Sequence, residues 1–500
     1  MNFKTTILAL TILGLVEFAR ANPWYYNSSA NVLSNEVWRL SVTRSGTSLT
    51  LSARQEGSGD LDLTDCFADT GYRVVTLGSS LFKKAPITQF VGPDVTVANA
   101  SAFQECSSLT NVLFSPDFKQ FGNHVLYKCA LLQTFSPTNM TKLTSSGYHV
   151  FNGTSRLSLG FSFPLLTSLP EGFFCNSAVV SVHAPAAKTI VLSAFSGSSI
   201  ASIEVSADLT TIGKQAFNSC KKLKAFTPMN LPKLTSFGEA AFLSCSVLEG
   251  NWSCDALTAL PKQAFSSCPR LVAFCAPKLK SVGDYAFQNC SALERVEVSD
   301  ALSSIGKQAF LSCTKLSEFS PTVLTNLSST GSAAFSGCSV LGGDWAAPKL
   351  TSIASEFFAS TKLSSFMAPK MSSVGGHAFR YCNQMEHLVM KGGGSIGDYA
   401  FQNFKASAVI DYLGDAGPSS IGTGAFIPIN SSAYVRVYLK RHRAIPGWAA
   451  YYTPVANLDN SFKTRSDYPG KRTLGLYAAT QSKAWVVNGD LNQQTIFSIR

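Results

Sequence analysis

The sequence predicts an α/β repeat solenoid of about sixteen coils, and three observations carry this prediction. A motif of the form Ile/Val-Gly-x-x-Ala-Phe-x-x-Cys-x-x-Leu returns every 21 to 25 residues. Apolar and polar residues alternate directly after each motif, which is typical of a short strand with one buried side. A fixed period of this length indicates small units that cannot bury their own apolar face and therefore stack on their neighbours.

Residues 1–21 are expected to be a secretory signal peptide. Lys4 precedes the apolar run 5–16, and the segment 19–21, Ala-Arg-Ala, offers small residues at the cleavage positions. The run is too short to span a membrane, and no later apolar run reaches the length that a transmembrane helix needs. We expect an exported protein without a transmembrane segment, either secreted or at the extracellular cell surface.

Residues 22–74 are expected to form a β-rich N-terminal cap, and residues 75–430 to form the solenoid. Taking the motif phenylalanine as the anchor of each coil, Phe82 marks the first turn and Leu126 fills one gap. The other anchors are Phe103, Phe151, Phe174, Phe195, Phe217, Phe242, Phe265, Phe287, Phe310, Phe335, Phe358, Phe379, Phe401 and Phe426.

One coil illustrates the expected local structure. Val296 and Val298 alternate with Arg295 and Glu297, so a short strand directs its apolar side inward and its polar side to solvent. The chain then turns and re-enters the core, where a motif glycine permits a special backbone conformation or a close approach of two backbones. The residues around the anchor that follows are expected to form one helical or 3₁₀ turn.

A second period lies above the first, because every fourth coil is longer than the others. The long coils end at Phe151, Phe242, Phe335 and Phe426, which are 91, 93 and 91 residues apart. The segments 135–147, 226–238 and 319–331 correspond in sequence. The repeated unit is therefore a block of four coils, about 92 residues long, and such repetition suits an extended contact surface better than a single pocket.

Nine of the thirteen cysteines follow their anchor by three residues and are expected to be small, buried core side chains. They are Cys106, Cys129, Cys220, Cys245, Cys268, Cys290, Cys313, Cys338 and Cys382. Exported proteins commonly contain disulfides, but an odd number leaves at least one thiol unpaired or bridged to another chain. Cys254 and Cys275 occupy near-equivalent places in consecutive coils and form the candidate disulfide.

The formal net charge is +11, and removal of residues 1–21 with Lys4, Glu17 and Arg20 leaves +10. Export and the spread of this charge over many coils argue against a nucleic-acid partner. The dense run 440–443, Lys-Arg-His-Arg, is either a solvated face or a contact for anionic glycans or lipid headgroups. The recurring Pro-Lys pairs are likewise either solvated turns or a basic ladder facing a ligand, and their lysines are Lys233, Lys278, Lys349 and Lys370.

Nothing in the sequence specifies an active site, so no enzyme, cofactor or metal is expected. The stretch 392–397 matches the GxSxG and GxGxxG strings, but it is one more copy of the repeat motif. The six histidines are scattered and lack the spacing of metal ligands. Asp60, Asp62 and Asp65 alternate as calcium ligands can, yet no ligand loop completes the set.

The pattern IGxxAFxxCxxLxxVxV resembles the BspA-type leucine-rich repeat over about residues 75–430. Residues 38–65 resemble the β-hairpin that opens such arrays, and 434–454 resemble the closing strand with its tryptophan-bearing helix. Residues 431–500 are expected to form a C-terminal cap, of which 455–500 show no resemblance and are expected to be β-rich. The resemblance implies a secreted or cell-surface protein that binds other proteins or cells.

The expected function is therefore adhesion or ligand binding, with protein or glycan ligands at a cell surface or matrix. The alternative is a structural or coat protein that self-associates laterally. The resemblance supplies no binding residues, so the solvent side of the strands is the default candidate on physical grounds. The candidate residues there are Glu294, Arg295, Glu297, Glu318, Glu386 and His387.

Overall fold

The computed structural model describes residues 24–64, 66, 71–405, 408–414 and 418–426, together with the backbone of five strands after residue 433. The chain divides into two compact units. One unit comprises Met1–Leu166 and Gly172–Val179, and the other comprises Thr167–Glu171 and Val180–Arg500. The expected leader, residues 1–21, lies outside the described residues.

The first unit opens with an antiparallel meander that leads into parallel coils. Segment 38–65, where a hairpin is expected, contains the antiparallel pair β3 and β4. One sheet has the order β1 (Tyr25–Asn27), β2 (Val32–Ser34), β3 (Arg39–Ser45), β4 (Ser48–Glu56), β6 (Arg73–Leu77), β8 (Val97–Ala98), β10 (Gln120–Phe121), β12 (Ser145–Ser146). The other has the order β11 (Thr134–Ser136), β9 (Asn111–Leu113), β7 (Ile87–Val91), β5 (Gly59–Asp62), and β13 (Gly160–Ser162) follows in the chain.

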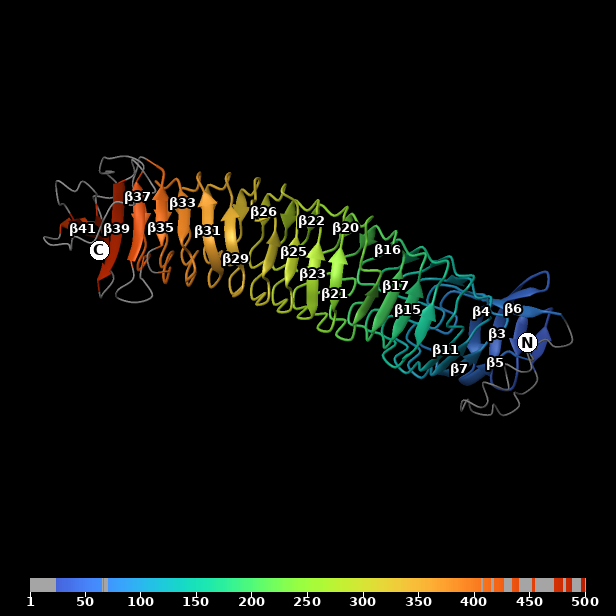
Figure 1. Ribbon diagram of the computed structural model, residues 1–500. Coiled ribbons are helices and arrows are strands. Elements are labelled where there is room, and N and C mark those ends of the chain that lie inside the picture. Colours follow the sequence, from blue (N-terminus) through green and yellow to red (C-terminus); the bar gives the residue numbers. More distant parts are fainter. Residues whose placement is uncertain are drawn as a thin grey trace. The chain divides into compact units, whose positions relative to one another are not determined.

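In the second unit each coil contributes one longer strand, here called a front strand, and one two-residue strand (Figure 1). The front strands are β15 (Ser181–Ala184), β17 (Ser202–Val205), β19 (Ala225–Thr227), β21 (Gly250–Ser253), β23 (Leu271–Cys275), β25 (Arg295–Glu297), β27 (Glu318–Ser320), β29 (Gly342–Ala346), β31 (Lys362–Ala368), β33 (His387–Met390) and β35 (Val409–Tyr412). The two-residue strands are β14 (Ser168–Leu169), β16 (Thr189–Ile190), β18 (Thr211–Ile212), β20 (Ser236–Phe237), β22 (Ala259–Leu260), β24 (Ser281–Val282), β26 (Ser304–Ile305), β28 (Ser329–Thr330), β30 (Ser352–Ile353), β32 (Ser373–Val374), β34 (Ser395–Ile396) and β36 (Ser420–Ile421). Parallel pairing joins each strand to its equivalents in neighbouring coils.

The anchor phenylalanines form the centre of the core. From Phe195 to Phe426 each ring stacks on the anchor of the next coil, with ring centroids 4.9 to 6.0 Å apart. The interplanar angles stay at or below 29°. Each anchor is buried, so the stack replaces water on both ring faces with another ring. The predicted apolar axis of the solenoid is confirmed.

The expectation of a helical or 3₁₀ turn around the anchor is wrong, because every regular element within the described residues is a strand. Those residues also contain no helical segment that could span a membrane. The reason that the turn is not helical is visible in the backbone hydrogen bonds. The N–H groups of Gln215, Phe217 and Ser219 donate to carbonyls of the next coil, at 2.7 to 2.9 Å. Gln215 and Ser219 have φ of 54° and 61°, which lies outside the right-handed helical region. Alternate residues thus face a neighbouring coil rather than their own turn.

This arrangement, here called the turn ladder, recurs in every coil of the second unit up to the Phe401 anchor. The N–H of Phe195 donates to the carbonyl of Ala216 at 2.8 Å, and the N–H of Phe401 donates equivalently to Ala425 at 2.8 Å. The remaining N–H groups close tight turns, as when Cys220 donates to Phe217 at 3.1 Å. Each coil therefore depends on the next coil for part of its backbone hydrogen bonding.

The motif cysteines are more than small core residues. Each of the nine thiols donates to the anchor carbonyl of the preceding coil, with Sγ···O distances of 2.8 to 3.1 Å. In coils without the cysteine, the hydroxyls of Thr154, Ser177 and Thr361 occupy its position and donate to the anchor carbonyl of their own coil. In a fourth such coil Ser198 lies within 3.6 Å of the thiol of Cys220. Ala85 and Phe404 hold the same position after Phe82 and Phe401, so a small hydrogen-bond donor is common at this position but is not required.

The motif glycines are required by close approach and not by an unusual φ. A Cβ on Gly306 would lie 2.4 Å from the backbone nitrogen of Asp284 in the preceding coil. On Gly375 it would lie 2.4 Å from the backbone nitrogen of Ser355. Neither glycine has a positive φ. Of the two roles that the sequence leaves open, the structure selects the close approach of two backbones.

The four-coil period appears as interruptions of the sheets. In three of the four long coils, those that end at Phe151, Phe242 and Phe335, a cis peptide bond precedes Pro137, Pro228 or Pro321. At Pro228 and Pro321 the front strands stop after β19 and β27, and only the isolated bridges Asn230–Ser253 and Val323–Ala346 lead to the next coil. The turn ladder continues across both interruptions, since Phe242 donates to Ala264 and Phe335 donates to Phe357.

After residue 426 the structure describes only strands. β37 (Tyr434–Leu439) pairs in parallel with β35 and antiparallel with β39 (Arg472–Ala479). β40 (Lys483–Val487), β41 (Ile496–Ile499) and β38 (Tyr452–Pro454) follow in sheet order. The expected tryptophan-bearing helix and the basic run 440–443 lie outside the described residues.

The adjacent glycines Gly375 and Gly376 give a matched test of the close approach. We expect Gly375→Ala to lower the free energy of unfolding by about 1–3 kcal/mol, because the new methyl group overlaps backbone that cannot yield. A Cβ on Gly376 would lie no closer than 3.3 Å to any neighbour, with the carbonyl oxygen of Asp398 at that distance and its backbone nitrogen at 3.6 Å. Gly376→Ala should therefore stay within about 1 kcal/mol of wild type in urea unfolding. Equal losses for the two variants would contradict this assignment.

A second test uses the pH dependence of stability. Burial raises the pKa of the Cys382 thiol from 9.0 to about 12. A raised pKa in the folded state means that stability is complete below pH 9 and is lost as the pH rises toward 12. Wild type should therefore lose about 1.4 kcal/mol more than Cys382→Ser between pH 8 and pH 10, because serine does not titrate there. Parallel pH profiles in chemical denaturation would show that the thiol does not remain protonated in the fold.

Candidate functional site

The outward side of the front strands, here called the front face, is the surface on which the expected binding residues lie. Successive residues of a strand alternate between core and solvent, so each front strand exposes about two side chains. Between β21 and β27 the register aligns these side chains in two rows. One row is Asn251, Ala273, Arg295 and Glu318, and the other is Ser253, Cys275, Glu297 and Ser320.

The structure brings together only part of the predicted set. Arg295 lies directly opposite Glu318, and Glu297 lies in the neighbouring row. Glu294 is exposed immediately before β25. These four residues share adjacent strands and offer both signs of charge to solvent.

Glu386 and His387 form a separate site, because β29 and β31 lie between their strand and β27. His387 Nε2 is 3.1 Å from Oδ2 of Asp411, which is 8% exposed. Glu386 is paired with Lys405 of the following coil. Both residues are therefore engaged with the next coil as well as facing solvent.

Asp344 is a site residue that the sequence-based reasoning missed. Its Oδ1 accepts hydrogen bonds from the hydroxyls of Ser365 and Ser364, at 2.7 and 2.8 Å. These two hydrogen bonds lower the pKa of the Asp344 carboxyl, so it is ionised at neutral pH. Alignment of the front strands would have identified it, because Asp344 lies in one row with Ser365 and the predicted site residue His387.

In the first unit the front strands carry an uncharged ladder with one acid at its end. Thr134 donates to Asn111 at 2.6 Å, and the amide of Asn111 lies 3.4 Å from Gln89. Gln89 and Thr88 in turn donate to Asp60. Asp62 instead accepts hydrogen bonds from Thr64. Asp60 and Asp62 thus have different partners, and Asp65 lies outside the described residues.

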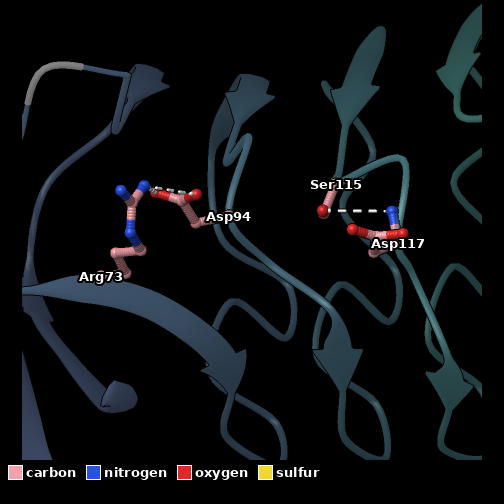
Figure 2. Close-up of polar contacts among 4 residues, drawn as sticks. All are labelled: Arg73, Asp94, Ser115 and Asp117. Carbon is pink, nitrogen blue, oxygen red and sulfur yellow. Dashed lines mark hydrogen bonds and ion pairs between the residues drawn. The ribbon is translucent and has the colours of Figure 1, made fainter. Parts of the chain in front are cut away.

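No cluster of three or more His, Cys, Asp or Glu suited to hold a metal occurs in the described part of the chain. A small cavity of about 120 Å³ lies at the start of the solenoid, beside Tyr72, Arg73 and Asp94. Figure 2 shows the Arg73 guanidinium directed at the Asp94 carboxylate, 3.0 Å away, with Ser115 and Asp117 paired in the coil beyond. Ligand pockets are usually ~300 Å³ or larger, so this cavity suits a few waters better than an organic ligand.

The lysines of the Pro-Lys pairs are partly engaged with neighbouring coils. Lys233 forms an ion pair with Asp208 at 2.8 Å, and Lys349 donates to Asn326 at 2.7 Å. Lys278 and Lys370 are exposed. Two of the four positions therefore cross-link adjacent turns, which favours the solvated-turn interpretation over a continuous basic ladder.

The histidines are less scattered than their sequence positions indicate. His124 and His149, on the turns of consecutive coils, stack with centroids 5.4 Å apart. Tyr148 meets His124 edge-on at 4.9 Å, and the Asn152 amide lies 3.0 Å from Nδ1 of His149. Burial, His149 and Lys83 lower the pKa of His124. The cluster is a packed surface feature of the first unit that no spacing rule would find.

All thirteen cysteines are free thiols in the structure. The backbone N–H of Cys254 donates to the carbonyl of Cys275 at 2.9 Å, so the candidate pair does lie in adjacent coils. Cys254 is fully buried, whereas Cys275 lies in the outward row beside Glu297. Their side chains thus leave opposite sides of the sheet, and the disulfide between them stays a prediction.

Comparison with known proteins gives the following likenesses. The chain resembles a leucine-rich repeat protein from Bacteroides ovatus with 17% identity and a TM-score of 0.49, covering 83% of this chain and 92% of that one. It resembles a leucine rich cell surface protein from Faecalibacterium prausnitzii with 19% identity and a TM-score of 0.40, covering 72% and 95%. It resembles the pneumococcal vaccine antigen PcpA with 12% identity and a TM-score of 0.33, covering 77% of this chain and 94% of that one. No match was found among curated proteins.

The sequence also matches a family model described as the BspA type leucine rich repeat region. The matched segments are 75–191, 144–272, 235–342, 258–386 and 351–438. They overlap and together span most of the chain, including every coil whose anchor, cysteine and turn ladder are described above. This protein belongs to the BspA-type leucine-rich repeat family.

Proposed function

We propose that this protein is exported and acts at a cell surface or in the surrounding matrix as an adhesion protein. It holds a protein or glycan ligand on the front face of its solenoid and performs no catalysis. The observation that carries this proposal is that the fold does not depend on the side chains of the front face. Its outward side chains contribute neither to the stacked core nor to the turn ladder.

This independence is visible where equivalent positions of two blocks are compared. The tryptophans Trp252 and Trp345 are both buried in the core. The outward residues just before them are the neutral Asn251 in one block and the ionised Asp344 in the other. The inward positions keep their chemistry while the outward positions change, as a surface adapted to a ligand would.

The family and the expected leader support the location. BspA-type repeats are a cell-surface family, and residues 1–21 have the features of a secretory signal. The front face is extended and regular, which suits a macromolecular ligand. The cavity beside Arg73 is smaller than pockets that bind organic ligands.

The GxSxG string does not support a hydrolase. Ser395 belongs to β34, whose residues pair with β36 as Ser395–Ser420 and Ile396–Ile421. A hydrolase nucleophile of this motif sits on a sharp strand-to-helix elbow with an oxyanion hole beside it. Ser395 instead occupies a repeated strand position that Ser304 and Ser373 also occupy. We therefore propose a binding role without catalysis.

The test is binding of the full secreted chain to intact cells and matrix proteins, followed by substitution within and outside the front face. We expect the double variant Arg295→Glu and Glu318→Lys to weaken saturable binding at least about tenfold, because it reverses both charges of an exposed pair on the front face. Lys315→Glu changes an exposed residue outside the front strands, in the turn before β27, and should leave binding within about twofold. No saturable partner, or equal loss from both changes, would overturn the proposal.

A second candidate function is lateral self-association as a coat or structural protein, and one observation favours it. The interruptions at Pro137, Pro228 and Pro321 recur once in each block of four coils, so neighbouring copies could align block by block. Electron microscopy of purified protein would test this. Regular assemblies combined with the absence of a cell-surface partner would favour the structural role over adhesion.

A further inference from the structure

The front face after the Pro321 interruption carries a partly exposed apolar row, here called the apolar stripe. It consists of Val323, Ala346, Met367 and Val389. The bridge Val323–Ala346 and the register of β29, β31 and β33 place these residues side by side on four consecutive coils. Val323 is 50% exposed and Met367 is 49% exposed, whereas Ala346 and Val389 are half-buried between and beside them. Exposed large apolar side chains that are linked by further apolar surface commonly mark an interaction site.

The fold does not require the stripe, because the preceding block has polar residues at most of the same positions. There the bridge joins Asn230 to Ser253, and the register continues to Cys275 and Glu297. The corresponding bridge in the first unit joins Asn139 to Ser162. Three copies of one architecture thus differ at this row, and only the last copy is apolar throughout. A feature that the other copies lack is not explained by the stability of the repeat.

The spacing of the stripe indicates the shape of its occupant. Adjacent strands lie ~4.8 Å apart, so the four side chains are spaced at about 4.8, 9.6 and 14.4 Å from the first. An α-helix laid across the strands presents residues i, i+3, i+7 and i+10 at about 4.5, 10.5 and 15 Å along its axis. An extended peptide presents one face only every ~6.6–6.8 Å and falls out of step after one coil. The stripe therefore matches one face of a helix.

Charges on either side of the stripe give that helix a direction. On one side, two residues earlier in β29, lies the ionised carboxylate of Asp344. On the other side the exposed Lys370 and Lys391 follow Met367 and Val389 at the ends of β31 and β33. A complementary helix would carry a cationic residue along the flank facing Asp344 and an acidic residue along the flank facing the lysines.

We infer that the apolar stripe is the docking site for an amphipathic α-helix of a partner protein. The helix bears apolar residues at i, i+3, i+7 and i+10 and opposite charges on its two flanks. This inference rests on the proposed binding function and names the class of ligand that the front face takes in the last complete block. Docking buries Met367 and Val323, whose exposure otherwise leaves apolar surface in water.

The experiment uses the full secreted chain and a phage-displayed library of 16-residue helical peptides. We expect enriched peptides to show the i, i+3, i+7, i+10 apolar spacing with Lys or Arg on one flank. Met367→Glu and Val323→Glu should each weaken their binding at least tenfold, and Met367→Leu should retain it. Both wild-type side chains are about half exposed, so either variant can report if the other fails to fold. Lys315→Glu, a change at an exposed residue of the preceding block outside the front strands, should leave binding within twofold.

Three outcomes would overturn the inference. These are no enrichment, enriched peptides that bind Met367→Glu as well as wild type, and enriched peptides without helical spacing. Sedimentation of the chain alone gives one further test. An oligomer of the wild type that dissociates in Met367→Glu would also overturn the inference, because it would show that a second copy occupies the stripe. A cell-surface partner that still binds Met367→Glu would reject the stripe and leave the proposed function standing. Enriched helical peptides without any cell-surface partner would support the stripe as a helix-binding site and reject the proposed function.

Discussion

The turn ladder is the constraint on which the rest of this structure depends. Alternate N–H groups around each anchor donate to the following coil, so no coil can satisfy its backbone alone. The residues that do so require a left-handed backbone at positions such as Gln215 and Ser219, and this excludes a helix. The close approach of neighbouring coils then demands glycine at Gly306 and its equivalents. The anchor carbonyl, already bonded to its own turn, takes its second hydrogen bond from the cysteine of the next coil.

The same constraint gives the two sides of the solenoid different structural roles. The turn side is occupied by hydrogen bonds and close backbone contacts, so it tolerates little change. The front strands need only their inward residues, and their outward residues can vary without affecting the stack. This explains how blocks with the same buried Trp252 and Trp345 present Asn251 in one case and Asp344 in the other. A repetitive fold thereby supports local differences in its surface.

The interruptions of the sheets show that strand pairing and the turn ladder connect the coils over different lengths. The two-residue strands of the second unit form sheets of four strands, and the front strands are interrupted after β19 and β27. The turn ladder runs on without a break up to the Phe401 anchor. The extra residues of the long coil at Pro321 lie between β27 and β28. They place Val323 beside Ala346 and so begin the apolar stripe. The block period is thus visible on the front face.

The sequence by itself determined the coil period, the stacked anchors, the inward and outward alternation of the strands and the four-coil block, because each of these is a spacing along the chain. It predicted one helical or 3₁₀ turn around the anchor, which the described part of the chain does not contain. Only the tertiary structure decided that these N–H groups bond to the next coil, and that Asp344 stands beside Ser365. It alone placed Val323 in one row with Met367, 44 residues away. Hydrogen-bond partners and neighbours across coils depend on the register of stacked strands, and a single sequence does not contain that register.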